Sequence, residues 1–245
     1  MIPPETYLQF HTVAMLPPIA GLALLAWLRP TDHGRSGVVN GLAIITALAV
    51  VYTLPWDSYL IRRGVWSYGE GVVAGRLWHV PIGEVLFFGL QPILTALWLS
   101  RLSIPTDQPL ALSARQRAMG VGAGLGLGVV GGLLLPSEST FYLGAILAWA
   151  APILALQWGF GWTQLWGARR AVALAVGLPT VYLWIVDRTA ISLELWTIAP
   201  ETTIGIAPVG LPIEEAVFFL VTNLFVVQGL VLYWWLLDRW GEWSG

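Results

Sequence analysis

The chain has 245 residues, of which 57% are hydrophobic and only 11% are charged. A soluble domain of this size has about a quarter of its residues charged, because its surface faces water, so the composition excludes a soluble fold. The absence of cysteine excludes disulfides and thiolate nucleophiles, and the absence of lysine excludes lysine Schiff-base chemistry. A net charge of -2 without a basic run argues against a nucleic-acid partner.

Seven apolar stretches are long enough to cross about 30 Å of hydrocarbon, which takes about 20 helical residues. They cover residues 7–28, 37–56, 81–101, 117–135, 139–158, 168–186 and 212–237. Because open sheets cannot satisfy their edges in lipid, we expect an all-α polytopic membrane protein with seven transmembrane helices. The first stretch is too long for a cleavable signal, and no basic residue precedes it.

The arginines are distributed unequally between the two sides of the membrane that the seven predicted spans define. Those on the amino-terminal side are Arg62, Arg63, Arg76 and Arg188. Those on the opposite side are Arg29, Arg35, Arg101, Arg115, Arg117, Arg169, Arg170 and Arg239. Because basic residues favour the cytoplasmic side, we expect an integral protein of the cell membrane, in contact with lipid, with its amino terminus outside and its carboxyl terminus in the cytoplasm.

The chain also repeats itself at a nearly constant offset. The recurring pairs are Tyr52 and Tyr182, Asp57 and Asp187, Trp66 and Trp196, Pro81 and Pro212, Ile82 and Ile213, Glu84 and Glu215, Phe87 and Phe218, and Phe88 and Phe219. This pattern predicts a first three-helix repeat in residues 1–112 and a second in residues 137–245. A linker helix in residues 113–136 restores the orientation of the second copy, so we expect parallel halves with a shared site between them.

Glycine recurs every four residues in the predicted linker helix, at Gly120, Gly124, Gly128 and Gly132. Such a ridge lets another helix approach closely. The same segment contains a Gly-x-Gly-x-x-Gly pattern at residues 126–131. A dinucleotide site needs a preceding strand and a following acidic residue, and neither fits a membrane span, so we interpret the pattern as helix packing.

Three acidic residues lie inside the predicted spans, namely Glu84, Glu214 and Glu215. Each stands in the first turn of a span that opens with proline, where a carboxylate can also serve as a cap for the positive end of the helix dipole. A cap needs no aromatic partner, but Phe-Phe follows three and four residues after Glu84 and Glu215. We therefore predict catalytic roles for these glutamates, with the cap as the alternative.

Further polar and aromatic residues form the rest of the predicted site. The candidates for substrate binding are Phe87, Phe88, Phe218, Phe219, Trp66, Trp196, Gln91, Thr222 and Asn223, and the supporting polar residues are Asp57, Asp187, Tyr52 and Tyr182. The two aspartates close their spans on the side of the glutamates and either orient them or are ordinary interfacial residues. Gln91, Thr222 and Asn223 could instead hold helices together. The three histidines show no ligand-like spacing, so we expect no metal and no cofactor.

Carboxylic acids withdrawn from water can act as general acids near neutral pH, and aromatic faces can stabilise a cation without attacking it. Together they favour proton-initiated carbocation chemistry on an apolar substrate. Protonating an alkene is difficult for a carboxylic acid, so the site must stabilise the cation strongly as it forms.

At these residues the chain resembles the carotenoid lycopene cyclases that occur as heterodimers in some actinobacteria and as fused chains in other bacteria, archaea and fungi. Members carry Pro-x-Glu-Glu or Pro-x-Glu-Asp in each half. Here the motif stands as Pro212-Ile213-Glu214-Glu215 and, with one departure at Gly83, as Pro81-Ile82-Gly83-Glu84. The resemblance covers essentially the whole chain.

The resemblance implies cyclisation of the linear ψ ends of lycopene to β-ionone rings without net redox change, giving γ- and β-carotene. It implies lycopene as the lipophilic polyene substrate, acid or base roles for Glu84, Glu214 and Glu215, and other carotenoid enzymes as partners. The glycine at position 83 leaves open whether the first half is a complete site or completes the second.

Two other classes have seven spans in a chain of this length. A microbial rhodopsin needs a lysine for retinal, which this sequence lacks. A parallel three-plus-one-plus-three transporter or binding protein, as in the SWEET sugar carriers, shares the helix arithmetic but should show a polar path across the membrane midplane. Here the polar residues gather near one end of the spans, which favours the enzyme.

Overall fold

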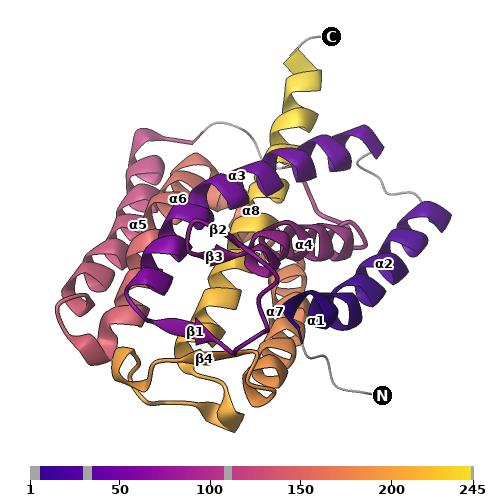
Figure 1. The fold of residues 1–245 in the computed structure, drawn as a ribbon. Helices are drawn as coiled ribbons and strands as arrows, with labels where there is room; N and C mark the ends of the chain where they lie inside the picture. The colour runs from indigo at the N-terminus through magenta and orange to yellow at the C-terminus, as the bar shows by residue number, and fades with distance from the viewer. Residues whose placement is uncertain (1–5, 30–34, 108–111, 244–245) are drawn as a thin grey trace.

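The computed structural model describes residues 6–29, 35–107 and 112–243 (Figure 1). Within these ranges, seven helical segments are long and apolar enough to cross a membrane. They are Tyr7–Leu28, Gly37–Arg62, Ile82–Leu99, Ala114–Leu134, Glu138–Gly167, Arg169–Ser192 and Ile213–Arg239. The all-α polytopic fold is thereby confirmed.

The helices are α1 (Tyr7–Ala14), α2 (Leu16–Leu28), α3 (Arg35–Arg62), α4 (Ile82–Leu99), α5 (Ala114–Leu134), α6 (Phe141–Gly167), α7 (Arg169–Ser192) and α8 (Ile213–Trp243). The short strands are β1 (Trp66–Tyr68), β2 (Arg76–Leu77), β3 (Val80–Pro81) and β4 (Trp196–Ile198), and single 3-10 turns are η1 (Glu138–Thr140), η2 (Pro200–Thr202) and η3 (Pro208–Gly210). We name α1 to α4 the first half and α6 to α8 the second half.

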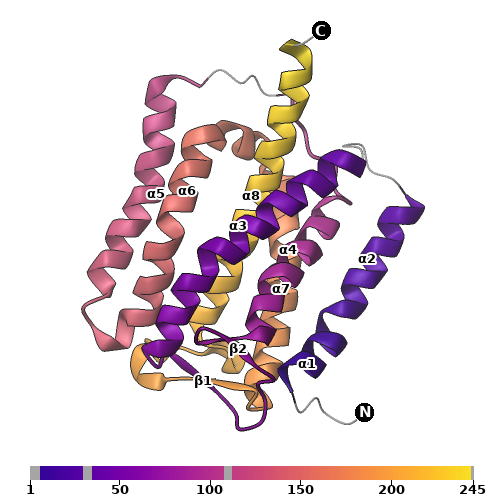
Figure 2. The ribbon, with the colours of Figure 1, turned by 45° about the horizontal axis from the view of Figure 1, so that its top comes forward.

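The two halves meet along the middle of the bundle, where α4 packs against α7 and α8. Helix α5 packs along α6 at the edge of the bundle, while α2 lies at the opposite edge (Figure 2). The short strands all lie at the end of the bundle where α1 begins (Figure 2). Loops of both halves therefore meet at this end of the bundle, and α4 and α8 both begin there.

The first predicted span is broken into α1 and α2 at Met15. Pro17 and Pro18 lack the backbone N–H that an uninterrupted helix needs, so the carbonyl of Ala14 has no helical partner from residue 18. The hydroxyl of Tyr182 in α7 donates to this carbonyl instead. The break thus becomes a contact between the two halves.

The second and sixth spans extend past the predicted ends at residues 56 and 186, to Arg62 and Ser192. The sequence prediction ended both spans at an aspartate, because a charged residue is costly in lipid. In the structure Asp57 and Asp187 are each 3% exposed and point into the protein, so the helices continue through them. The prediction that the aspartates close their spans is wrong.

Strands β1 and β4 pair in an antiparallel manner, which joins the loops of the two halves. The register centres on the pair Ser67 and Thr197, whose hydroxyl oxygens lie 2.9 Å apart. These two residues are 130 positions apart. The pairing therefore has the local symmetry that a two-fold rotation relating the halves would produce.

The glycine face of α5 is confirmed in part. A Cβ atom at Gly124 would lie 2.3 Å from the backbone nitrogen of Ala155 in α6, and one at Gly120 would lie 2.3 Å from the carbonyl oxygen of Trp158. Gly132, however, has open space around it, and Gly131 makes the close approach instead. The exact four-residue spacing fails here because a helix turns once in 3.6 residues.

Candidate active site

A cavity with an empty volume of about 630 Å³ lies between the two halves, at the end of the bundle where the strands lie. We name it the acidic cavity, because four carboxyl groups line it. Its lining residues are Tyr7, Phe10, His11, Met15, Asp57, Trp66, Glu84, Phe87 and Phe88 from the first half and its loop, and Tyr142, Leu183, Val186, Asp187, Trp196, Ile198, Glu215, Phe218 and Phe219 from the second. Both halves therefore contribute residues to a single cavity.

Glu84 stands in the first turn of α4, which begins directly after Pro81. Its Oε1 atom accepts a hydrogen bond of 3.0 Å from the hydroxyl of Tyr68, which in turn accepts one of 2.9 Å from the indole nitrogen of Trp66. Burial, together with the nearby Glu84 carboxyl, raises the pKa of the Tyr68 phenol well above its ordinary value, so the phenol remains a donor. The Tyr7 phenol also interacts with Glu84.

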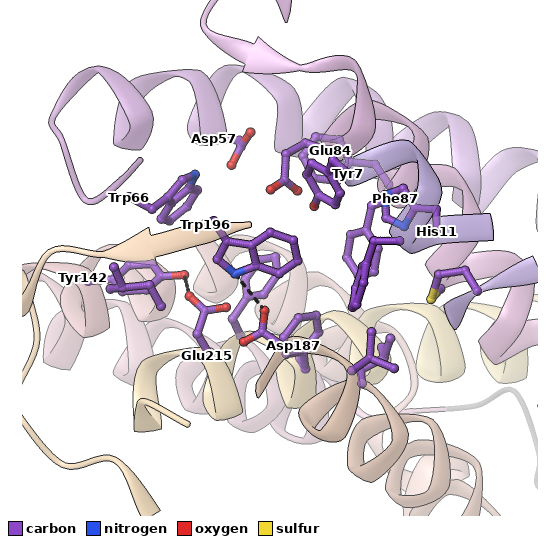
Figure 3. A pocket seen from close by; sticks show the side chains of 18 residues that line it. Tyr7, His11, Asp57, Trp66, Glu84, Phe87, Tyr142, Asp187, Trp196 and Glu215 are labelled. Atoms are coloured by element: carbon purple, nitrogen blue, oxygen red, sulfur yellow. Dashed lines mark hydrogen bonds between the residues drawn. The ribbon is translucent and has the colours of Figure 1, made fainter. Parts of the chain in front are cut away.

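Glu215 occupies the corresponding turn of α8. Its Oε1 atom accepts a hydrogen bond of 2.6 Å from the hydroxyl of Tyr142, whose side chain is buried (Figure 3). The rings of Trp66 and Tyr142 lie 5.3 Å apart, and those of Trp196 and Tyr7 lie 4.9 Å apart. Each half therefore places a tryptophan against a tyrosine of the other half.

The two aspartates complete the acidic set. The indole nitrogen of Trp196 donates to Oδ1 of Asp187 over 3.2 Å (Figure 3). Asp57 lies on the opposite side of the cavity, near Glu84 (Figure 3). Since the lining includes no arginine among the described residues, and the sequence has no lysine, the carboxyl groups face one another and an apolar wall.

Aromatic rings form that wall. Phe87 and Phe219 meet edge to face at 5.9 Å, and Trp56, which lies behind the wall, stacks on Trp149 at 4.6 Å and on Phe218 at 5.9 Å. The electron-rich faces of such rings attract a cation. Rings arranged in this way are suited to stabilising a cation near the carboxyl groups.

A second cavity, with an empty volume of about 1570 Å³, adjoins the acidic cavity and shares Phe87, Phe88 and Phe218 with it. We name it the apolar cavity. It lies among α3, α4, α6 and α8, and most of its lining is aliphatic or aromatic. A molecule with a reactive end and a long apolar chain can thus place the end among the carboxyl groups and the chain in the apolar cavity.

Three predicted polar residues lie at or near the apolar cavity rather than the acidic one. Tyr52, Gln91 and Thr222 line it. The hydroxyl of Tyr52 in the first half donates to the carbonyl of Trp149 in the second half over 2.8 Å. Conversely, the hydroxyl of Tyr182 in the second half donates to the carbonyl of Ala14 in the first half. Both tyrosines therefore support helix packing, and Tyr182 lines neither cavity.

Asn223 is fully buried and joins the halves through hydrogen bonds. Its Oδ1 atom accepts from Gln91 at 2.8 Å and from Thr95 at 2.6 Å, and its side-chain nitrogen donates to Thr180 at 3.0 Å. Because Asn223 lines neither cavity, the geometry favours the helix-joining interpretation over substrate binding.

Glu214 is also separate from the acidic cavity. Its side chain is fully buried, and its Oε1 atom accepts a 2.8 Å hydrogen bond from the backbone nitrogen of Ile204 in the loop before α8. Neighbouring helical residues point about 100° apart, which explains why Glu215 enters the cavity and Glu214 does not. The position of Glu214 suits holding the loop.

Gly83 is the departure from the family motif, and the structure gives its physical reason. A Cβ atom at this position would lie 2.6 Å from the ring of Tyr7, which is closer than side chains tolerate. The carbonyl oxygen of Gly83 also accepts from Nε2 of His11 over 2.9 Å. Tyr7 therefore fills the space that a larger residue at position 83 would need.

Sequence reasoning missed the tyrosines and the histidine of the cavity. Tyr7 and Tyr142 are each followed by leucine and, ten residues later, by Pro17 and Pro152. This recurrence could have identified them, but its offset is 135 rather than 130, so it lies outside the aligned pattern. His11, whose ring stacks near Phe87 at 6.0 Å, has no counterpart and gave no signal.

Among the described residues, no group of three or more histidine, aspartate or glutamate side chains is arranged to hold a metal ion. The expectation of a site without metal or cofactor stays a prediction.

The fold and the cavities define a polytopic membrane protein that places carboxyl groups and aromatic faces at the end of a binding space for a long apolar molecule. The sequence model of the lycopene cyclase family matches residues 9–101 and 135–234. The chain belongs to the lycopene cyclase family.

Several relatives cover most of this chain. The lycopene beta-cyclase of Halobacterium salinarum (strain ATCC 29341 / DSM 671 / R1) is 48% identical over 96% of this chain and 98% of its own length. The bifunctional lycopene cyclase/phytoene synthases of Gibberella fujikuroi and Aspergillus niger are 39% and 36% identical over 92% and 90% of this chain, each over 39% of its own length. No solved structure matches the fold significantly.

Proposed function

We propose that this protein is a lycopene β-cyclase, which converts the linear ends of lycopene to β-ionone rings and so forms γ- and β-carotene. The observation that carries this proposal is the acidic cavity, in which Glu84 and Glu215 face aromatic rings beside an apolar cavity. The name and the length-wide similarity of the Halobacterium salinarum relative support the same reaction.

The reaction is an isomerisation in which one proton enters and one proton leaves. A carboxylic acid protonates C2 of the terminal C1=C2 double bond, which leaves a cation at C1. The electron pair of C5=C6 then forms the C1–C6 bond and moves the cation to C5. Loss of the proton from C6 forms the C5=C6 double bond of the β ring.

Glu84 and Glu215 are the carboxyl groups that we assign to proton donation. Each accepts a hydrogen bond from a tyrosine, Tyr68 or Tyr142, and this bond stabilises the negative charge that a glutamate acquires when its proton leaves. The stack of Trp56, Trp149 and Phe218 adjoins the cavity and favours the cation that forms at the same moment. We assign Glu214 to holding the loop before α8.

The substrate fits the two cavities in one orientation. One ψ end lies among the carboxyl groups, and the polyene passes Phe87, Phe88 and Phe218 into the apolar cavity. Because both halves face one acidic cavity, the first half completes the site of the second and holds no site of its own. The two ends of lycopene are then cyclised one after the other.

We also propose that the halves arose by duplication and that the protein lies in the cell membrane with its amino terminus outside. The pairing about Ser67 and Thr197 supports the first proposal, and the arginine distribution supports the second. Other carotenoid enzymes are expected partners, since lycopene must be delivered and its cyclic products used.

Pigment chromatography of bacteria that accumulate lycopene tests the function. The parent chain should form γ- and β-carotene, whereas Glu84→Gln and Glu215→Gln should each lose at least about 100-fold in rate, the scale of a general acid. Glu138→Gln, at an exposed glutamate in η1, is the matched control and should retain the parent rate. Unchanged lycopene with a folded parent chain at matched membrane level would contradict the proposal.

A further inference from the structure

The acidic cavity contains two carboxyl groups that the proton-donating step does not use, Asp57 and Asp187. Both side chains are 3% exposed, and the Oδ2 atom of each is buried without a hydrogen-bond partner. An oxygen without a hydrogen-bond partner is costly in a protein interior and therefore needs an explanation. A role in the reaction would explain why the protein retains it. Both aspartates line the cavity that is assigned to the substrate end.

The four carboxyl groups differ in the donors around them. Glu84 and Glu215 each accept a hydrogen bond from a phenol, and Asp187 accepts one from the indole of Trp196. Oδ2 of Asp57 accepts none from the described residues. A group that gives up a proton gains from such donors, whereas a group that takes a proton needs an oxygen lone pair that is not already engaged. Oδ2 of Asp57 has such a lone pair.

The reaction requires such a group. After the C1–C6 bond has formed, a base must remove the proton from C6, and a carboxylate other than the donor glutamate can do so while the donor still faces C2. Asp57 lies on the first half, near Glu84, and interacts electrostatically with both Glu84 and Glu215. It therefore faces the same substrate end as the donors from a different helix, α3.

We propose that Asp57 is the base that takes the proton from C6, an inference that rests on the proposed cyclase function. The C6–H bond breaks, its electron pair forms C5=C6, and the proton binds a carboxylate oxygen of Asp57. Each turnover thus leaves one glutamate without its proton and Asp57 with an extra one. Transfer of that proton back to the glutamate restores the site without any other reactant.

The position of the base determines the ring type. The C5 cation can lose a proton from C6, from C4 or from the methyl group on C5, and these losses give a β, an ε or a γ ring, respectively. A base fixed by α3 near C6 selects the β ring. Removal of this base should therefore change which product forms as well as how fast it forms.

The test compares Asp57→Asn with Glu138→Gln, a change from carboxyl to amide at an exposed glutamate outside the cavity. The purified full chains are placed in liposomes with lycopene, and the ring types are separated by chromatography. Asp57→Asn should form β rings at least about 100-fold more slowly than the parent. Its other products should include ε rings, γ rings or alcohols that form when water captures the C5 cation. The control Glu138→Gln should form β rings at the parent rate. Unchanged β-ring formation by Asp57→Asn, while the parent cyclises lycopene, would overturn the inference.

A second measurement covers an Asp57→Asn variant that forms no rings. Lycopene is incubated with each variant in D2O, recovered, and analysed by mass spectrometry. If the glutamates still protonate C2 and only the base is missing, reversal of the first step should leave deuterium at C2 of the recovered lycopene. A folded variant that forms no rings and incorporates no deuterium would count against Asp57 as the base. Asp57→Glu, which restores a carboxylate, should recover β rings in part.

Discussion

The hydrogen bond from Tyr142 to Glu215 can be tested by removing one hydroxyl group. The Tyr142 hydroxyl donates to Glu215 over 2.6 Å inside the protein. A hydrogen bond to a charged group contributes about 1.5–3 kcal/mol, so Tyr142→Phe should slow cyclisation by roughly 10- to 150-fold. The measurement is the initial rate of ring formation in liposomes. Tyr59→Phe, at a tyrosine that is 43% exposed, is the control, and equal rates for both variants would show that the phenol does not assist Glu215.

Gly83 gives a second residue-scale prediction. Restoring the motif glutamate with Gly83→Glu should destroy the site rather than improve it, because even a Cβ atom would lie 2.6 Å from the ring of Tyr7. The yield of folded protein from membranes and its activity should both fall. Gly89→Ala, on the same helix, meets only a methyl group of Thr46 at 4.0 Å and should be tolerated. An active Gly83→Glu variant would contradict the role given to Tyr7.

The sequence identifies the residues that recur and misses those that depend on packing. Glu84, Glu215 and their neighbouring phenylalanines could be found because two copies of one pattern stand in one chain. Glu214 shares the motif, but it faces the loop because it stands one residue, about 100°, away around the helix. The tyrosine partners could not be assigned, since only the tertiary structure brings Tyr142 to Glu215 and Tyr7 to Glu84.

At the scale of elements, α5 and α6 make a close helix pair whose two sides can be compared. Gly124→Leu should prevent this contact, because a Cβ atom would already lie 2.3 Å from the Ala155 backbone, whereas Gly126→Leu points into open space. We expect Gly124→Leu to lower the thermal stability of the detergent-solubilised protein strongly and Gly126→Leu to leave it near the parent value. Equal melting curves would exclude the close approach.

The elements themselves were largely predictable, because seven apolar runs separated by charged or proline-rich segments translate directly into helices. Their ends were not. The sequence predicts an end of the span at Asp57, because it does not show that α3 can bury this residue against the other half. The β1–β4 pair was also beyond prediction, since it joins two three-residue strands from distant loops and has no strand-like periodicity of its own.

At the scale of the whole molecule, the site exists only where the halves meet. The chain divided between residues 112 and 113, outside both halves, should be inactive as either fragment and active when both are expressed together, because Gln91 bonds Asn223 and Trp66 packs on Tyr142 across the interface. Carotene formation in bacteria that accumulate lycopene is the measurement. Activity from a single fragment present in the membrane would show that one half holds a complete site.

The reciprocal tyrosine bonds also bear on how the protein is made. Tyr182 follows its partner Ala14 by 168 residues, and Trp149 follows its partner Tyr52 by 97 residues. At a synthesis rate of about 5–20 residues per second, roughly 8 to 34 seconds separate the synthesis of Ala14 from that of Tyr182. During that interval the carbonyl of Ala14 at the proline break lacks its later partner Tyr182. Until α7 is synthesised, the first half therefore holds a backbone carbonyl without a partner at the proline break, and the contact between the halves forms late in synthesis.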